Sequence, residues 1–295
     1  MKKGRLILFI LILVTGLSIT FADSFKSQNQ VEIISSDRYT DVKQLISEKV
    51  YKYGASEVLV VLDIDNTILT SDVDLGSDIW YQWQRGKLEV KPTENQKVAC
   101  LFEDAIGLLY ELGTMHLTDT NLPTFINEWQ SQNISLFALT SRSPRYRTAT
   151  ERELKKQGID LTKTAIRPIN DSLPVYRYNL KREMSYMKGV MMTSGMNKGE
   201  MLAHMLAKTD RSFSAVVFVD DSEKNVQALV SAFFESSMDF NICHYTKVEN
   251  DRKAINGGVI LTQEQANSMS NDWDKLNNTL NTIFPNREGG CVSLD

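Results

Sequence analysis

The stretch Val58-Leu59-Val60-Val61-Leu62-Asp63-Ile64-Asp65-Asn66-Thr67 decides the fold of this chain. Its first five residues form a continuous run of valine and leucine, which is typical of a strand buried on both faces of a parallel sheet. The run ends in two carboxylates separated by one residue, so charged side chains follow the strand directly. We therefore predict a central strand over residues 58–62, with a ligand site beyond its carboxyl end.

Other apolar runs and helical patterns alternate along the chain. Three further runs predict strands, at residues 134–139, 215–219 and 240–245. Helices are predicted by periodic apolar residues and by stop and cap signals, from Val42 to a stop at Gly54, from Pro144 to near Gly158, through Val226, Leu229 and Phe233, and from Thr262 onward. A short strand at 164–166 and a hairpin within 175–192 are also expected. This alternation predicts an α/β protein with a Rossmann-like, doubly wound parallel sheet.

The first two strong strands are separated by a segment much longer than an ordinary strand-to-helix connection. Within it Val98, Leu101, Phe102, Ala105, Leu108 and Leu112 recur at helical spacing before Gly113. We expect residues 71–133 to form a helical cap inserted after the first motif, and residues 23–70 and 134–295 to form the core domain.

The N-terminus has the pattern of an export signal. Lys2, Lys3 and Arg5 precede an apolar run, and small residues follow near Ala22. We interpret residues 1–22 as a cleaved signal peptide, with an uncleaved anchor as the alternative. The mature chain is then expected in the periplasm or secreted, with no stable membrane span, because no later segment is long and apolar enough.

Composition limits the partners. The chain has 295 residues, a formal net charge of −4 and no long run of Lys or Arg, so a nucleic-acid partner is not expected. Its three cysteines, Cys100, Cys243 and Cys291, permit at most one internal disulfide and leave one thiol over. Oligomeric state is not encoded in any pattern that we recognise.

Polar side chains follow several predicted strands. Asp63 and Asp65 end the first strand, and Asp220-Asp221 ends another. Two like unit charges 4 Å apart repel by roughly 4 kcal/mol at an effective dielectric of 20, so these carboxylates need a cation if they meet. Mg²⁺ takes oxygen ligands of this kind. Lys198, ahead of a predicted helix, would add a further positive charge beside a phosphoryl group.

The second strand ends in Thr140-Ser141-Arg142. The two hydroxyls lie where a substrate would bind, and Arg142 is the best placed of the nearby arginines to grip a substrate phosphate. A solvated helix charge is nevertheless the favoured interpretation of these arginines, because arginine is usually exposed.

Asp63-x-Asp65-x-Thr67, Thr140, Lys198 and Asp220-Asp221 resemble, in order, the four motifs of the haloacid dehalogenase (HAD)-like superfamily. The resemblance spans roughly residues 57–245. The export signal and the insert are similar to secreted bacterial acid phosphatases of this superfamily, although the residues around the motifs look closer to another bacterial branch. The fourth motif departs from many relatives because its two aspartates are adjacent, which leaves open which of them touches the metal.

The resemblance implies a role for each motif residue. Asp63 would be the nucleophile and a metal ligand, and Asp65 the general acid/base and a ligand through its carbonyl. Thr140 would hold the transferring phosphoryl oxygen, Lys198 would neutralise charge, and Asp220 and Asp221 would bind Mg²⁺. The function implied is Mg²⁺-dependent hydrolysis of small phosphomonoesters through phospho-Asp63. A phosphotransferase of the same fold and a non-catalytic exported binding or effector protein are the alternatives.

Overall fold

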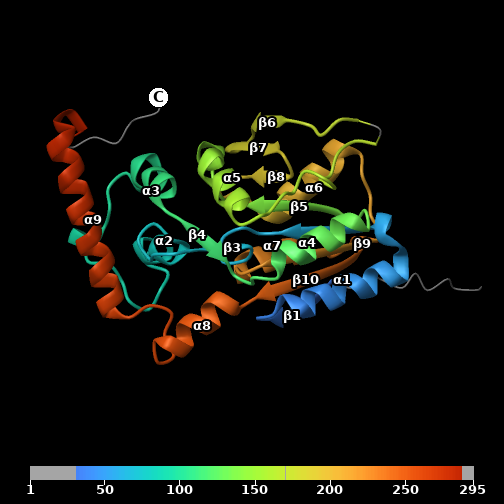
Figure 1. The fold of residues 1–295 in the computed structure, drawn as a ribbon, viewed down its shortest axis with the longest axis horizontal. Coiled ribbons are helices and arrows are strands. Elements are labelled where there is room, and N and C mark those ends of the chain that lie inside the picture. The colour runs from blue at the N-terminus through green and yellow to red at the C-terminus, as the bar shows by residue number, and fades with distance from the viewer. Residues whose placement is uncertain (1–30, 170, 288–295) are drawn as a thin grey trace, which may run out of the picture.

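The computed structural model describes residues 31–169 and 171–287. The described residues contain an eight-stranded sheet with helices on both faces (Figure 1). Its strands are β1 (Glu32–Ser36), β2 (Val58–Leu62), β5 (Ser135–Thr140), β6 (Tyr176–Asn179), β7 (Glu183–Met187), β8 (Val190–Met192), β9 (Ala215–Asp220) and β10 (Asp239–Tyr245). The predicted signal peptide, residues 1–22, lies outside the described residues.

Most neighbours in this sheet run parallel. The order across it is β1-β10-β9-β2-β5-β8-β7-β6. Every pairing from β1 to β8 is parallel, and β7 and β6 are added antiparallel at one edge. The predicted α/β class with a mostly parallel central sheet is therefore confirmed, and β2 lies at its centre.

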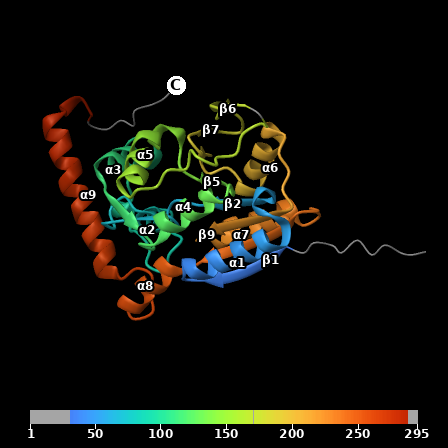
Figure 2. The same cartoon turned by 45° about the vertical axis from the view of Figure 1, so that its right-hand side comes forward.

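The helices of the described chain cover both faces of the sheet and continue beyond it (Figure 2). They are α1 (Tyr39–Tyr53), α2 (Asp78–Gln84), α3 (Ile106–Leu112), α4 (Leu122–Ser131), α5 (Arg147–Lys156), α6 (Lys198–Thr209), α7 (Glu223–Phe233), α8 (Lys247–Ile255) and α9 (Gln263–Ile283). Short turns of other helix types are η1 (Ala55–Glu57), η2 (Glu94–Gln96), η3 (Leu101–Ala105, a π-helix), η4 (Pro144–Tyr146) and η5 (Pro285–Arg287).

The core has two halves, one on each face of the sheet. All five residues of β2 are fully buried, as the unbroken apolar run predicts. Val58, Val60 and Leu62 pack toward the face covered by α1 and α4, while Leu59 and Val61 pack toward the face covered by α6 and α7. Alternate residues of a strand point to opposite faces, so only a continuous apolar run fills both.

Several local predictions fail for identifiable reasons. Residues 164–166 form no strand, because β8 pairs with β5 from Ala138 onward and leaves only the bond from Leu136 N to Thr164 O. The periodic segment from Val98 begins as a π-helix at Leu101 and continues as α3. Glu32–Ser36, for which no strand was predicted, forms the edge strand β1.

The segment between β2 and β5 divides into two parts. Its first part stands away from the sheet and contains α2, η3 and α3, with a small antiparallel pair of β3 (Leu69–Ser71) and β4 (Met115–Leu117) at its base (Figure 1). Its last part, α4, packs on the sheet beside α1, where Lys43 Nζ and Glu128 Oε2 are 2.5 Å apart. We call the first part, residues 72–114, the insert.

The C-terminal helices hold the insert from outside. The rings of Trp80 on α2 and Trp273 on α9 have centroids 6.1 Å apart, and Arg252 on α8 binds Asp74 through two hydrogen bonds of 2.6 and 3.0 Å. Within residues 31–169 and 171–287, every helix falls short of the length or apolarity that a bilayer span requires. Cys243 on β10 is a buried free thiol, and Cys291 lies outside the described residues.

We expect Gly199→Ala to destabilise the protein by about 1–3 kcal/mol, because the added Cβ overpacks the contact between α6 and α7. That atom would lie 2.4 Å from Ala228 O, which is backbone and cannot turn aside. Urea unfolding measures the effect. The matched control is Gly107→Ala on α3, whose Cβ would meet a ring edge of Tyr146 at 3.3 Å and should be nearly neutral. An equal loss of unfolding free energy in Gly199→Ala and Gly107→Ala would contradict the close packing of α6 on α7.

Candidate active site

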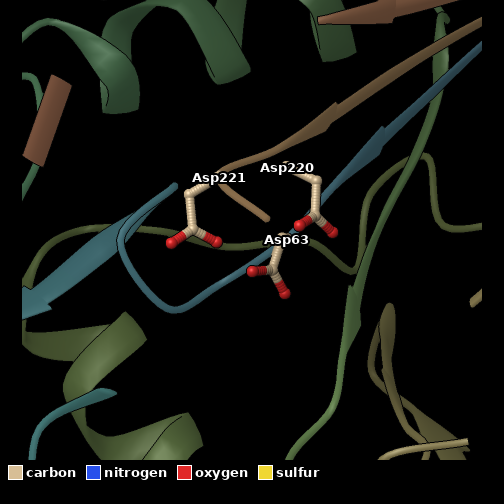
Figure 3. A group of neighbouring side chains, drawn as sticks. All are labelled: Asp63, Asp220 and Asp221. Atoms are coloured by element: carbon tan, nitrogen blue, oxygen red, sulfur yellow. The ribbon is translucent and has the colours of Figure 1, made fainter. Parts of the chain in front are cut away.

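The candidate site begins at the carboxyl end of β2, where Asp63 follows the last strand residue. Parallel pairing sets Leu62 opposite Val219, and Asp63 N donates to Val219 O at 2.9 Å. Asp63 is therefore level with Asp220 at the end of β9. Figure 3 shows the carboxylates of Asp63, Asp220 and Asp221 close together at this edge, directed into the same space.

Lys198 joins two of these carboxylates. Its Nζ donates to Asp63 Oδ1 at 2.5 Å and to Asp220 Oδ2 at 2.6 Å, and its side chain is fully buried. The lysine is the first residue of α6, whose N-cap is Asn197, and Asn197 Oδ1 accepts from Glu200 N. The sharp start of the helix thus delivers Lys198 from the loop after β8 to the centre of the sheet edge.

Asp220 is fixed from the other side as well. Asn225 Nδ2 donates to both of its oxygens, at 2.9 and 3.2 Å, and Ser222 N donates to Oδ1 at 2.9 Å. Asn225 therefore braces the loop that carries Asp220.

The turn after Asp65 depends on Asn66, which adopts a left-handed backbone with a φ of 55°. Asparagine tolerates this conformation better than most residues. Its Nδ2 donates to Asp221 Oδ2 at 3.2 Å and to Asp78 Oδ2 at 3.3 Å. Asn66 therefore links the end of β9 to the first residue of α2, a connection that sequence reasoning missed because it depends on how the insert folds back.

Asp65 is bound by Arg142. Arg142 Nε and Nη2 donate to its two oxygens at 2.9 and 2.7 Å, a bidentate geometry. The same guanidinium donates to Thr150 Oγ1 at 2.8 Å and lies 4.3 Å from the ring centroid of Tyr110. Arg142 is therefore buried and paired, and it is not a solvated helix charge.

The two predicted hydroxyl residues differ in environment. Thr140 is fully buried at the end of β5, and its Oγ1 accepts from Arg142 N at 3.1 Å, which leaves its own proton to donate. Ser141 is exposed. The role predicted for Ser141 in substrate binding stays a prediction.

The site carries more negative than positive charge, and its pKa values reflect this. Burial raises the pKa of Asp63 to about 8, helped by Asp220 and Asp65 and opposed by Lys198. Burial, then the charges of Asp78 and Asp63, raises the pKa of Asp221 well above its usual range. For Lys198, burial would lower the pKa, but the charges of Asp220 and Asp63 outweigh it and raise the pKa.

These residues fit a hard divalent cation. One carboxylate oxygen from each of Asp63, Asp220 and Asp221 lies within 4.8 Å of the others, so all can reach a common point. The donors are all oxygens, as Mg²⁺ prefers. Burial is the main cause of the raised pKa values of Asp63 and Asp221, and a bound cation would favour their ionised forms.

A pocket opens between this edge of the sheet and the insert. It is lined on the sheet side by Asp65, Asn66 and Arg142, and on the insert side by Ser77, Asp78, Leu109 and Tyr110. Trp80 and Trp83 do not line this pocket, because both are fully buried in the packing of the insert. The pocket thus has polar groups on both sides, together with apolar side chains such as Leu109, and adjoins Asp65.

Comparison with known proteins gives a family and two distant relatives. Residues 35–285 match the family described as "Protein of unknown function (DUF2608)". A protein of Chlamydia pneumoniae bearing the name "Putative outer membrane protein" is 22% identical over 197 residues, 65% of this chain and 71% of the relative. A protein of the same name from Chlamydia trachomatis is 22% identical over 175 residues, 59% of this chain and 63% of the relative.

We expect the stability of the protein in EDTA to fall as the pH rises from about 5 to 8. In this range the folded protein holds a proton on Asp63, whose pKa is about 8, while the unfolded chain has released it. Each such proton lowers the free energy of unfolding by up to about 1.4 kcal/mol per pH unit. Asp63→Asn should reduce the slope.

Urea unfolding at several pH values measures these slopes. The pKa values of Asp221 and Asp78 are also raised, so part of the slope should persist in Asp63→Asn. Asp272→Asn, an exposed α9 carboxylate, is the control and should match the wild type. A slope in Asp63→Asn as steep as that of the wild type would contradict the raised pKa.

Proposed function

The chain belongs to the DUF2608 family, and we propose that it is a Mg²⁺-dependent phosphomonoesterase of the HAD-like type with Asp63 as nucleophile. The observation that carries this proposal is the meeting of Asp63, Lys198, Asp220 and Asp221 at one point on the sheet edge. Three separate segments supply groups suited to a phosphoryl centre, where catalysis is mainly positioning and charge stabilisation.

In the proposed first step, an Asp63 oxygen attacks the phosphorus of the ester. A P–O bond to Asp63 forms while the bond to the leaving alkoxide breaks, and Asp65 gives that oxygen a proton. Water then attacks phospho-Asp63, Asp65 takes the proton of the water, and phosphate leaves. Lys198, 2.5 Å from the attacking carboxylate, stabilises charge throughout.

Thr140 and Arg142 have roles in binding the phosphoryl group under this proposal. The Thr140 hydroxyl can donate to a phosphoryl oxygen because its own oxygen already accepts from Arg142 N. Arg142 holds Asp65 in place through two hydrogen bonds. When the ester enters, the Arg142 guanidinium releases Asp65 and binds the phosphoryl group instead. Asp65 is then able to act on the leaving oxygen while Arg142 turns to the phosphate.

Asp63, Asp220 and Asp221 would hold the cation, with the Asp65 carbonyl as a further ligand. Bound Mg²⁺ would supply the positive charge that lets carboxylates and a phosphate dianion share one pocket. Asn225 keeps Asp220 aimed at this point through two hydrogen bonds.

The insert acts as a cap in this proposal, because the pocket beside Asp65 is closed on its outer side by α2 and α3. We also propose that the chain works outside the cytosol, in the periplasm or after secretion. Support comes from the signal-like residues 1–22 and from the names of the two relatives, which refer to an outer membrane.

We expect the mature chain to release phosphate from p-nitrophenyl phosphate or another small phosphomonoester in Mg²⁺. Both EDTA and Asp63→Asn should abolish this release, by at least about a thousandfold for the substitution, because the nucleophile is lost. A colorimetric phosphate assay over a panel of esters measures it.

The control for this experiment is Asp272→Asn, which should keep full activity. Retained turnover in Asp63→Asn would exclude the covalent route. Inactivity of the wild type on every ester would instead favour the binding-protein alternative. Adding glycerol and searching for glycerol phosphate separates hydrolysis from phosphotransfer.

Mg²⁺ should raise the melting temperature of the wild type at pH about 8 and should not raise that of Asp220→Asn. A ligand that binds only the folded state stabilises it by mass action, and the substitution removes one of three carboxylates at the site. Differential scanning fluorimetry with and without millimolar Mg²⁺ measures the shift. An equal shift in both proteins would place the cation elsewhere.

A further inference from the structure

Asp78 is the first residue of α2 and lines the pocket from the side of the insert. It faces Asp65 and Arg142 across the space that the leaving group of a phosphate ester would occupy under the proposed function. The position carries no motif in the sequence and follows Ser77, so it reads there as an ordinary acidic residue in a first helical turn.

The other charges around this pocket are neutralised by partners. Arg142 is paired with Asp65. Glu153, at the back of the pocket, binds Arg152 at 2.8 Å and Lys156 at 3.0 Å. Neither pair leaves a free charge for a ligand.

Asp78 is different because no cation contacts it among the described residues. Gln82 Nε2 and Asn66 Nδ2 both donate to Oδ2, at 2.5 and 3.3 Å. No donor within the described chain reaches Oδ1. The charge of Lys87 lowers the pKa of Asp78 without a hydrogen bond between the two. The Nζ of Lys87 lies above the ring of Tyr81, 4.7 Å from the centroid.

The place of Asp78 relative to the reacting group is set by Asn66. One amide nitrogen of Asn66 donates to both Asp78 and Asp221, so the two accepting oxygens lie no farther apart than those two hydrogen bonds combined. With the phosphoryl group beside Asp221, as the proposed function requires, a charged group four bonds from phosphorus can therefore reach Asp78.

We propose that Asp78 selects phosphate esters whose leaving group carries a positive charge, as in the phosphates of small amino alcohols. The inference rests on the proposed function, and it names the substrate class. An ammonium group would pair with Oδ1 of Asp78, whereas a second phosphate or a carboxylate would meet an unbalanced negative charge. Burial and the charge of Asp65 raise the pKa of Asp78 to about 6, so the group is ionised at pH 8.

The test compares three esters of nearly equal size at pH about 8: phosphoethanolamine, 2-hydroxyethyl phosphate and phosphoglycolate. Their leaving groups are cationic, neutral and anionic. We expect kcat/KM to fall in that order, with about tenfold or more between the first and the last, because unit charges a few ångströms apart interact strongly in a partly buried pocket. Equal values, or a preference for phosphoglycolate, would overturn the inference.

Asp78→Asn should reduce the ratio between phosphoethanolamine and phosphoglycolate by about tenfold, because it removes the charge at nearly constant shape. Glu111→Gln is the matched control. It removes one negative charge from α3, outside the pocket, where Glu111 pairs with Arg152. An unchanged ratio in Asp78→Asn, or an equal change in both variants, would contradict the assignment. If Asp78→Asn does not fold, the ranking in the wild type decides.

Binding separates this inference from the proposed function. Calorimetry with Asp63→Asn and Mg²⁺ gives the Kd of each ester without turnover, and Asp63→Asn/Asp78→Asn gives the same values without the Asp78 charge. Tighter binding of phosphoethanolamine that is lost in the double variant supports the inference even if the wild type hydrolyses nothing. Hydrolysis of p-nitrophenyl phosphate together with equal kcat/KM for the three esters would support the proposed function and would contradict the role of Asp78.

Discussion

The buried ammonium of Lys198, shared between Asp63 and Asp220, is the contact on which the site depends. It joins the ends of β2 and β9 to the start of α6. An ammonium with no solvent around it is stable only with partners, and two adjacent carboxylates are stable only with a cation between them. The three groups therefore require one another. The close approach of α6 to α7 at Gly199, the next residue, keeps the ammonium at that depth.

The central sheet was predictable because burial on both faces leaves a plain signal. Val58–Leu62 and Ala215–Asp220 are apolar without interruption up to their ends, and both lie at the middle of the sheet. Edge elements carry a weaker signal. Glu32–Ser36 has one covered side and a mixed composition, so it resembles a loop. The π-helix at Leu101–Ala105 shares the apolar spacing of a regular helix and could not be separated from α3 by periodicity.

For the site, sequence identified residues that follow strands but not the contacts made by the insert. Asp63, Lys198 and Asp220 meet because parallel register brings strand ends together, which is a property of the sheet. Arg142 was placed near the pocket, yet its pairing with Asp65 depends on rotamers that no spacing encodes. The contact between Asn66 and Asp78 depends on the path of the chain through α2, which no sequence pattern gives. The one local sign was an asparagine after the strand, a residue type that tolerates the left-handed backbone found there.

The packing of α9 on α2 has a consequence for the order in which the molecule can be completed. Trp80 enters the chain early, and Trp273, against which it lies, comes nearly two hundred positions later. The last strand of the sheet ends at Tyr245, so every strand of the sheet is synthesised before α9 begins at Gln263. During synthesis the sheet and its triad of charges can assemble while the insert still lacks its outer support. The pocket wall that carries Asp78 gains that support only when the final helix has emerged and docked.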